Sequence, residues 1–177
     1  MKQKTTVFKS VRAMTVAAML VTMSVVIGFF CKTYLNYVNG LFRITFENLP
    51  IIMSGLLFGP VVGGFVGAAS DLVSYLLSPQ TYPPNLIVTL GAAVVGIVSG
   101  VMAKYAVKKR GTAQIIVSGA AAHIMGSMII KTIGLYQFYG ILVLWRIPLY
   151  IVIASLEILV ICFLFSRNNF RRLIEKL

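Results

Sequence analysis

Residues 43–75, RITFENLPIIMSGLLFGPVVGGFVGAASDLVSY, decide the fold of this chain. The stretch is almost wholly apolar or small, and it is interrupted at Gly59-Pro60, where proline removes a helical donor and glycine permits a turn. We interpret it as two apolar helices, 47–59 and 61–78. The first makes only about 20 Å of helix, so it is short for a bilayer crossing, and we expect it to be tilted or shielded by neighbours.

The composition around this stretch is that of a membrane protein. Of 177 residues, 59% are hydrophobic and 11% are charged, and the mean hydropathy is +0.93. With four acidic residues and one histidine, a multi-carboxylate active site or a multi-histidine metal site is excluded. Cys31 and Cys162 lie far apart in apolar stretches, so no disulfide framework is predicted. We therefore predict no catalytic residues, no metal and no cofactor.

Further apolar runs extend on both sides. Residues 13–31 are uncharged and close to the roughly 20 residues that cross a bilayer as a helix, and no cleavage site follows them. Three later runs have similar character, at 86–103, 112–130 and 146–166. The sequence therefore predicts an all-α integral membrane fold, with residues 1–177 forming a single bundle of six transmembrane helices.

The net charge of +12 is distributed in blocks between these runs, which is typical of a polytopic membrane protein and not of a nucleic-acid-binding surface. Six crossings place twelve basic residues on the side of the termini and four on the other side. Five crossings would instead place six basic residues on the side of the N-terminus and ten on the other side. Because basic loops stay in the cytoplasm, we expect six crossings, both termini cytoplasmic, and a multi-pass protein of the cell membrane.

Several charged residues converge on the outer half of the predicted bundle. Asp71 lies inside the third helix, and burial of an ionisable group in a membrane usually marks a functional site. Three cations and four aromatic side chains are predicted near it: Arg43, Lys131, Arg146, Tyr75, Tyr136, Tyr139 and Trp145. Such a pocket would offer an acceptor, anion-pairing donors and stacking surfaces. Alternatively, Lys131, Trp145 and Arg146 are interfacial anchors, and Asp71 forms a structural salt bridge with Arg43 or Lys131.

Two further patterns lie deeper in the membrane. His123 and Glu157 have similar predicted depths, and we favour a buried pair over a proton relay, while His123 stays a candidate ligand contact.

Glycines recur every four residues from Gly55 to Gly67, and Asp71 continues that row. Small residues at this spacing let helices approach closely, and Ala13 and Ala17 form a similar pair that could serve internal packing or a partner helix.

The chain contains no phosphate-binding G-x-x-x-x-G-K-[ST] loop and no sign of inverted repeats. Transport would therefore be passive, or another subunit would drive it.

Residues 43–75 also resemble a known family of membrane proteins. Arg43-Ile-Thr-Phe, Leu49-Pro50 and Gly55-Leu-Leu-Phe-Gly-Pro, followed by the glycine row and Asp71, resemble helices two and three of the S components of energy-coupling-factor (ECF) vitamin transporters. The chain is most similar to the folate-specific members. The resemblance implies a six-helix bundle that captures a vitamin from outside, with 32–46 acting as a gate. It implies no enzymatic activity.

The same resemblance implies partners. These are a membrane scaffold subunit and two cytoplasmic ATPases, with a small-x-x-x-small motif on the first helix making the docking contact, which Ala13 and Ala17 match.

Folate suits the candidate site chemically. Its pterin ring presents N–H donors suited to Asp71 and can stack on an aromatic side chain, and its glutamate tail carries carboxylates for Arg43, Lys131 or Arg146. Riboflavin, thiamine or pantothenate remain alternatives, and so do a small polytopic membrane enzyme or a scaffold.

Overall fold

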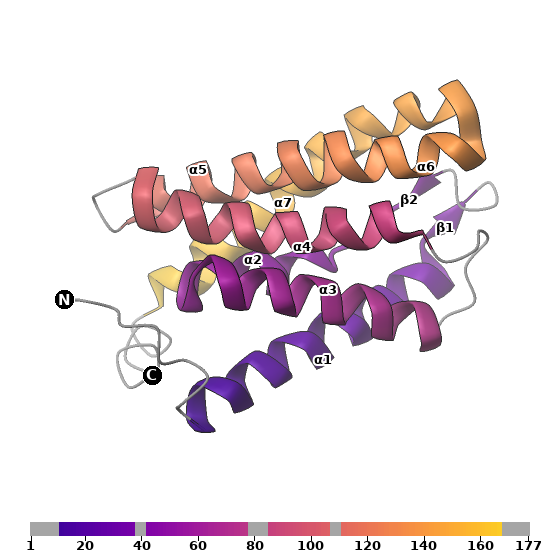
Figure 1. The fold of residues 1–177 in the computed structure, drawn as a ribbon. Coiled ribbons are helices and arrows are strands. Elements are labelled where there is room, and N and C mark those ends of the chain that lie inside the picture. Colours follow the sequence, from indigo (N-terminus) through magenta and orange to yellow (C-terminus); the bar gives the residue numbers. More distant parts are fainter. Residues whose placement is uncertain (1–10, 38–41, 78–84, 107–110, 168–177) are drawn as a thin grey trace.

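A computed structural model describes residues 11–37, 42–77, 85–106 and 111–167 (Figure 1). The N-terminal half contains helix α1 (Val11–Tyr34), a two-stranded antiparallel hairpin β1 (Asn36–Tyr37) and β2 (Phe42–Arg43), and helices α2 (Asn48–Phe58) and α3 (Pro60–Leu77). The C-terminal half contains α4 (Leu86–Val101), η2 (Met102–Ala106), α5 (Thr112–Ala122), η3 (His123–Lys131), α6 (Thr132–Tyr139), η4 (Gly140–Trp145) and α7 (Arg146–Ser166). Apart from the small hairpin, the described chain is helical.

The chain breaks at Gly59, between α2 and α3. Gly59 has φ of 90°, a value that favours glycine, and its N–H donates to Gly55 O at 2.9 Å. Proline begins the next helix at Pro60, where a missing N–H costs no hydrogen bond. This agrees with the break inferred from the sequence.

The fifth predicted helix is longer than the sequence suggested. It was expected to end at 130 because Lys131 follows, but the helical path continues through η3 and α6 to Tyr139 and reverses at Gly140, which has φ of 57°. The physical reason is that Lys131 is buried and does not lie in a polar loop, so its charge does not end the helix. Beyond the reversal, α7 runs back beside α5 (Figure 1).

Glycines bring α2, α3 and α4 into backbone contact. A Cβ at Gly63 would lie 2.4 Å from Gly96 O, and one at Gly67 would lie 2.2 Å from Ala92 O. A Cβ at Gly55 would lie 1.9 Å from Ser99 Oγ. The predicted glycine row is therefore a packing surface, as expected for small residues between close helices.

The outer surface of the bundle is strongly apolar. Four described stretches are long and apolar enough to cross a membrane, and Asn48–Phe58 is a shorter apolar helix. The four are Val11–Tyr34, Pro60–Leu77, Leu86–Tyr105 and Thr112–Ser166, the last of which folds back on itself (Figure 1). Large side chains such as Phe65, Leu76 and Leu159 are exposed all around the bundle, which suits a lipid environment. Residues 48–55 of α2 are all buried, so neighbours shield the short helix.

The small-residue pair on α1 faces into the bundle. Ala13 is buried, and Ala17 packs against the hydrophobic core that contains Leu20. Of the two interpretations offered by the sequence, internal packing is the one that this geometry supports. Ala18 and Thr22, on the other side of α1, are exposed.

Candidate functional site

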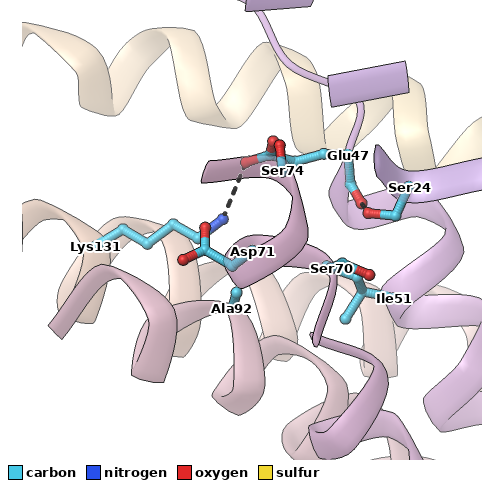
Figure 2. Close-up of a pocket in the computed structure, with 8 residues that line it drawn as sticks. All are labelled: Ser24, Glu47, Ile51, Ser70, Asp71, Ser74, Ala92 and Lys131. Carbon is cyan, nitrogen blue, oxygen red and sulfur yellow. Dashed lines mark hydrogen bonds and ion pairs between the residues drawn. The ribbon is translucent and has the colours of Figure 1, made fainter. Parts of the chain in front are cut away.

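Glu47 is the centre of a buried charge cluster at one end of the bundle. It directly precedes α2, and its carboxylate lies between two lysines: Lys131 Nζ is 3.5 Å from Oε1, and Lys32 Nζ is 3.8 Å from Oε2. Lys32 comes from the last turn of α1 and also donates a hydrogen bond to Ser74 Oγ on α3. Figure 2 shows Lys131 reaching Glu47 across the pocket. Two cations therefore hold one carboxylate inside an apolar bundle.

Asn48 extends this cluster toward η3. Its side-chain oxygen accepts a hydrogen bond from Lys131 Nζ at 3.1 Å, and its Nδ2 lies 3.4 Å from Ser127 Oγ. On the opposite side, Ser24 Oγ donates to Glu47 O at 2.7 Å. The cluster thus ties α1, α2 and η3 together through polar groups.

The helical segment η3 is wound as a π-helix, and it carries the polar residues of this region. Its wider i→i+5 turns are uncommon in proteins and frequently occur at functional sites. His123, Ser127 and Lys131 recur every four residues along η3, and all three are buried. One face of η3 therefore presents these polar groups to the interior.

The first of two small hollows lies beside this cluster (Figure 2). Its lining residues are Ser24, Glu47, Ile51, Ser70, Asp71, Ser74, Ala92 and Lys131. Asp71 is half-buried and accepts a hydrogen bond from Thr89 Oγ1 of α4 at 2.7 Å. Of the two salt-bridge partners considered for Asp71, Lys131 pairs with Glu47 instead.

The second hollow lies on the other side of Lys131 and Glu47. Its lining includes Thr45, Asn48, Ser127, Arg146 and Tyr150, with Val88 and Leu135 as apolar walls. Each hollow has room for only one or two water molecules.

Arg146 is enclosed between aromatic rings at the start of α7. Its guanidinium carbon lies 6.0 Å from the Tyr139 ring centroid and 5.9 Å from that of Tyr150, distances at which a cation interacts with a ring face. Arg146 is 3% exposed and Lys131 is 6% exposed. The alternative in which these two residues are interfacial anchors is therefore wrong, because an anchor keeps its charge at the membrane surface.

The remaining candidate residues are less central. Tyr136 and Trp145 are 54% and 69% exposed and line neither hollow, and Tyr75 is half-buried outside both linings. Arg43 lies in β2, and its side chain is outside the described part of the structure. Of the predicted residues, Lys131 lines both hollows, Asp71 lines the first and Arg146 lines the second, while Tyr139 contacts Arg146 without lining either.

The predicted contact between His123 and Glu157 is present. His123 Nε2 lies 2.7 Å from Glu157 Oε2, and both side chains are fully buried, which joins η3 to α7. Neither residue lines either hollow. This arrangement supports a structural pair and gives His123 no direct place in the candidate site.

Sequence reasoning missed Glu47 and Asn48, which are central to the site. Glu47 was predicted only as the first residue of a helix, although an acidic residue at the start of a largely apolar run is itself a signal of a buried charge. Lys32 was not among the predicted site residues. Ser24 and Ser127 carried no signal beyond their places on interior helix faces.

An apolar helical bundle that encloses a charged, hydrogen-bonding cluster at one end is typical of an integral membrane protein, and this cluster is its candidate site. The family model "ECF transporter, substrate-specific component" matches residues 12–173, and the chain belongs to this family. This is a family of transporter components and not of enzymes.

Two individual relatives match about half of this chain. The chain is 34% identical over 94 residues to "Folate transporter FolT" of Clostridium novyi (strain NT), a match that covers 52% of this chain and 51% of that protein. It is 33% identical over 90 residues to an uncharacterized protein of Mycoplasma pneumoniae, covering 51% of this chain and 18% of that protein. The matches thus span about half of the first relative and less of the second.

A solved structure shares the fold. The crystal structure of FolT bound with folic acid superposes with a TM-score of 0.68, covering 91% of this chain and 98% of that chain at 21% identity.

Proposed function

We propose that this chain is the substrate-binding component of an ATP-driven ECF importer, and that its vitamin is folate. The observation that carries the proposal is the buried Glu47 carboxylate held between Lys32 and Lys131, with the Asn48 amide beside it. The similarity to a relative named as a folate transporter supports the choice of vitamin.

The cluster suits the hydrogen-bonding edge of a pterin. A 2-amino-4-oxopteridine presents an amino group and a ring N–H side by side, and a carboxylate accepts two such donors together. Glu47 is the acceptor that we assign to this edge, and we assign the amide of Asn48 and the ammonium of Lys131, which hydrogen-bond each other in the structure, to the ring's acceptor atoms. Asp71, on the neighbouring hollow, is a second acceptor.

The charge balance of the site favours an anionic ligand. Lys32, Lys131 and Arg146 contribute three cations, whereas Glu47 and Asp71 contribute two carboxylates. The carboxylates of a glutamate tail pair well with a guanidinium, and we assign Arg146, with the Tyr139 and Tyr150 rings beside it, to that end.

Ligand entry requires the site to open. Pockets for drug-sized ligands have volumes of roughly 300 Å³ or more, far above the space in the two hollows. We propose that 32–46, which includes Lys32 and the β1–β2 hairpin, acts as the gate. Lys32 ties this segment to Glu47 and Ser74, and these are the contacts that opening would break, whereas the hydrogen bond from Ile44 N to Leu35 O at 3.2 Å lies within the segment.

We further propose that residues 1–177 form one membrane domain that crosses the cell membrane six times, with both termini in the cytoplasm. The beginning of α1 and the end of α7 lie at the same end of the bundle (Figure 1). The excess of basic residues near that end supports its placement in the cytoplasm.

Partner subunits are also part of the proposal, namely a membrane scaffold and two ATPases. Because Ala13 and Ala17 face inward, we assign docking to the exposed small residues Ala18 and Thr22 instead. Thr22 Oγ1 donates to Ala18 O at 3.1 Å, which turns its hydroxyl back onto α1 and leaves a shallow surface for a partner helix.

The test is direct ligand binding by the full chain purified in detergent. Folic acid should bind in a calorimetric titration, and any co-purifying molecule identified by mass spectrometry should be a folate. Glu47→Gln should weaken folic acid binding at least tenfold, because the neutral amide presents a single acceptor oxygen. Binding of riboflavin, thiamine or pantothenate in its place would overturn the choice of vitamin, and the absence of any ligand would favour a scaffold.

A further inference from the structure

Gly91 of α4 lies directly beside the stem of Lys131. A Cβ built at Gly91 would be 2.7 Å from Lys131 Cγ and 3.3 Å from Lys131 N. It would also be 3.1 Å from Gly126 O on η3, and a Cβ at Gly126 would in turn be 2.7 Å from Gly91 O. The two backbones therefore touch, and the Lys131 stem passes through the space that Gly91 leaves.

We propose that Gly91 is a positioning residue of the binding site, because its missing side chain leaves the groove along which Lys131 reaches Glu47 and Asn48. The inference rests on the proposed function, in which Lys131 contacts the ligand. Lys131 Nζ makes its 3.5 Å and 3.1 Å contacts from the far end of a four-carbon stem. Displacement at Cγ changes the rotamer near the backbone and moves the ammonium away from both partners.

A methyl group at position 91 would displace the side chain of Lys131. The two backbone contacts, at 3.1 Å to Gly126 O and 3.3 Å to Lys131 N, are less severe than the 2.7 Å contact with Lys131 Cγ, which is part of a flexible side chain. Separation of the two helices would open the interface that buries Val95 and Ser127. The stem of Lys131 is the movable part, and we expect the substitution to act mainly on its path.

A glycine also lies against Glu47, the partner of Lys131, on the opposite side of the site. A Cβ at Gly28 of α1 would lie 3.0 Å from Glu47 Oε2 and 3.3 Å from Ser74 Oγ. Both members of the Glu47–Lys131 pair thus lie against a helical glycine. Alanine is the better helix former at such positions, so the benefit of glycine here is the space it leaves.

The experiment is a double-mutant cycle read by folic acid affinity and by thermal melting of the purified full chain. Gly91→Ala and Lys131→Ala should each weaken binding at least tenfold. The double variant should match Lys131→Ala within threefold, because the alanine at 131 has no stem to displace. Gly119→Ala is the matched control: its Cβ would lie 2.7 Å from Ile158 Cγ1, outside the site, and it should bind within threefold of the unaltered protein.

The outcomes separate the two proposals. Unchanged affinity in Gly91→Ala, or losses that multiply in the double variant, would overturn the positioning role while leaving the site intact. Unchanged affinity in Lys131→Ala would overturn the site itself and this inference with it. If Gly91→Ala does not fold, the double variant should regain a cooperative melt, and failure of both to fold would show that Gly91 serves packing alone.

Discussion

The His123–Glu157 contact provides a test of whether this buried pair is structural or belongs to the transport mechanism. Its atoms are 2.7 Å apart and neither side chain reaches solvent, so removal of one partner leaves the other buried without its contact. Leaving a buried polar group unsatisfied costs about 1–3 kcal/mol, and breaking a buried ion pair costs about 3–5 kcal/mol. The value common to both ranges, about 3 kcal/mol, is the loss in free energy of unfolding that we expect when one partner is removed.

For a chain of this length, 1 kcal/mol corresponds to about 2–4 °C in melting temperature. We therefore expect Glu157→Leu alone to lower the Tm by about 6–12 °C. The double variant His123→Leu/Glu157→Leu should recover to within about 4 °C of the unaltered protein, because apolar replacement of both members of a buried pair is often neutral.

The assay is thermal melting in detergent, combined with uptake in cells at a temperature below the lowest Tm. Uptake by the double variant should match that of the unaltered protein. A double variant that is folded but inactive in uptake would refute the structural interpretation, because only a mechanistic role, such as a proton relay, would be lost with the pair.

The other predictions concern the ligand, the helix interface and the partner surface. Asp71→Asn should weaken folic acid binding at least tenfold by calorimetry with normal expression, since a half-buried acceptor charge is lost; equal affinity would remove Asp71 from the site. Gly63→Ala should lower the yield of folded protein sharply, because its Cβ would lie 2.4 Å from Gly96 O, whereas Gly111→Ala meets nothing within 4 Å and should melt normally. Ala18→Trp should spare folic acid binding and abolish uptake in cells, and surviving uptake would place the docking surface elsewhere.

Local sequence patterns were sufficient to predict much of the helical architecture. The apolar runs and Gly59-Pro60 predicted the break between α2 and α3, because proline and a left-handed glycine act on the backbone of their own segment. The four-residue glycine spacing predicted close helix packing for a similarly local reason. The end of the fifth helix was wrong, because a lysine in an apolar sequence was interpreted as a boundary although the folded chain buries it.

The candidate site was predicted only in part. Asp71, Lys131 and Arg146 were identified because charges are costly in a membrane, and all three line the hollows. Their partners were not identified. Glu47 was expected at a helix boundary. The sequence did not distinguish Tyr139, whose ring lies beside Arg146, from Trp145, whose side chain is exposed.

Hydropathy and the spacing of small residues thus predict a helical membrane bundle, because each depends on the local sequence of single helices, and the motifs of residues 43–75 carry the resemblance to the family. Which charges meet depends on how the helices rotate and pack against one another. Glu47 and Lys131 are 84 positions apart, and they lie 3.5 Å from each other because α2 and η3 pack in the same bundle around α4. Contacts of that kind are decided by the tertiary structure.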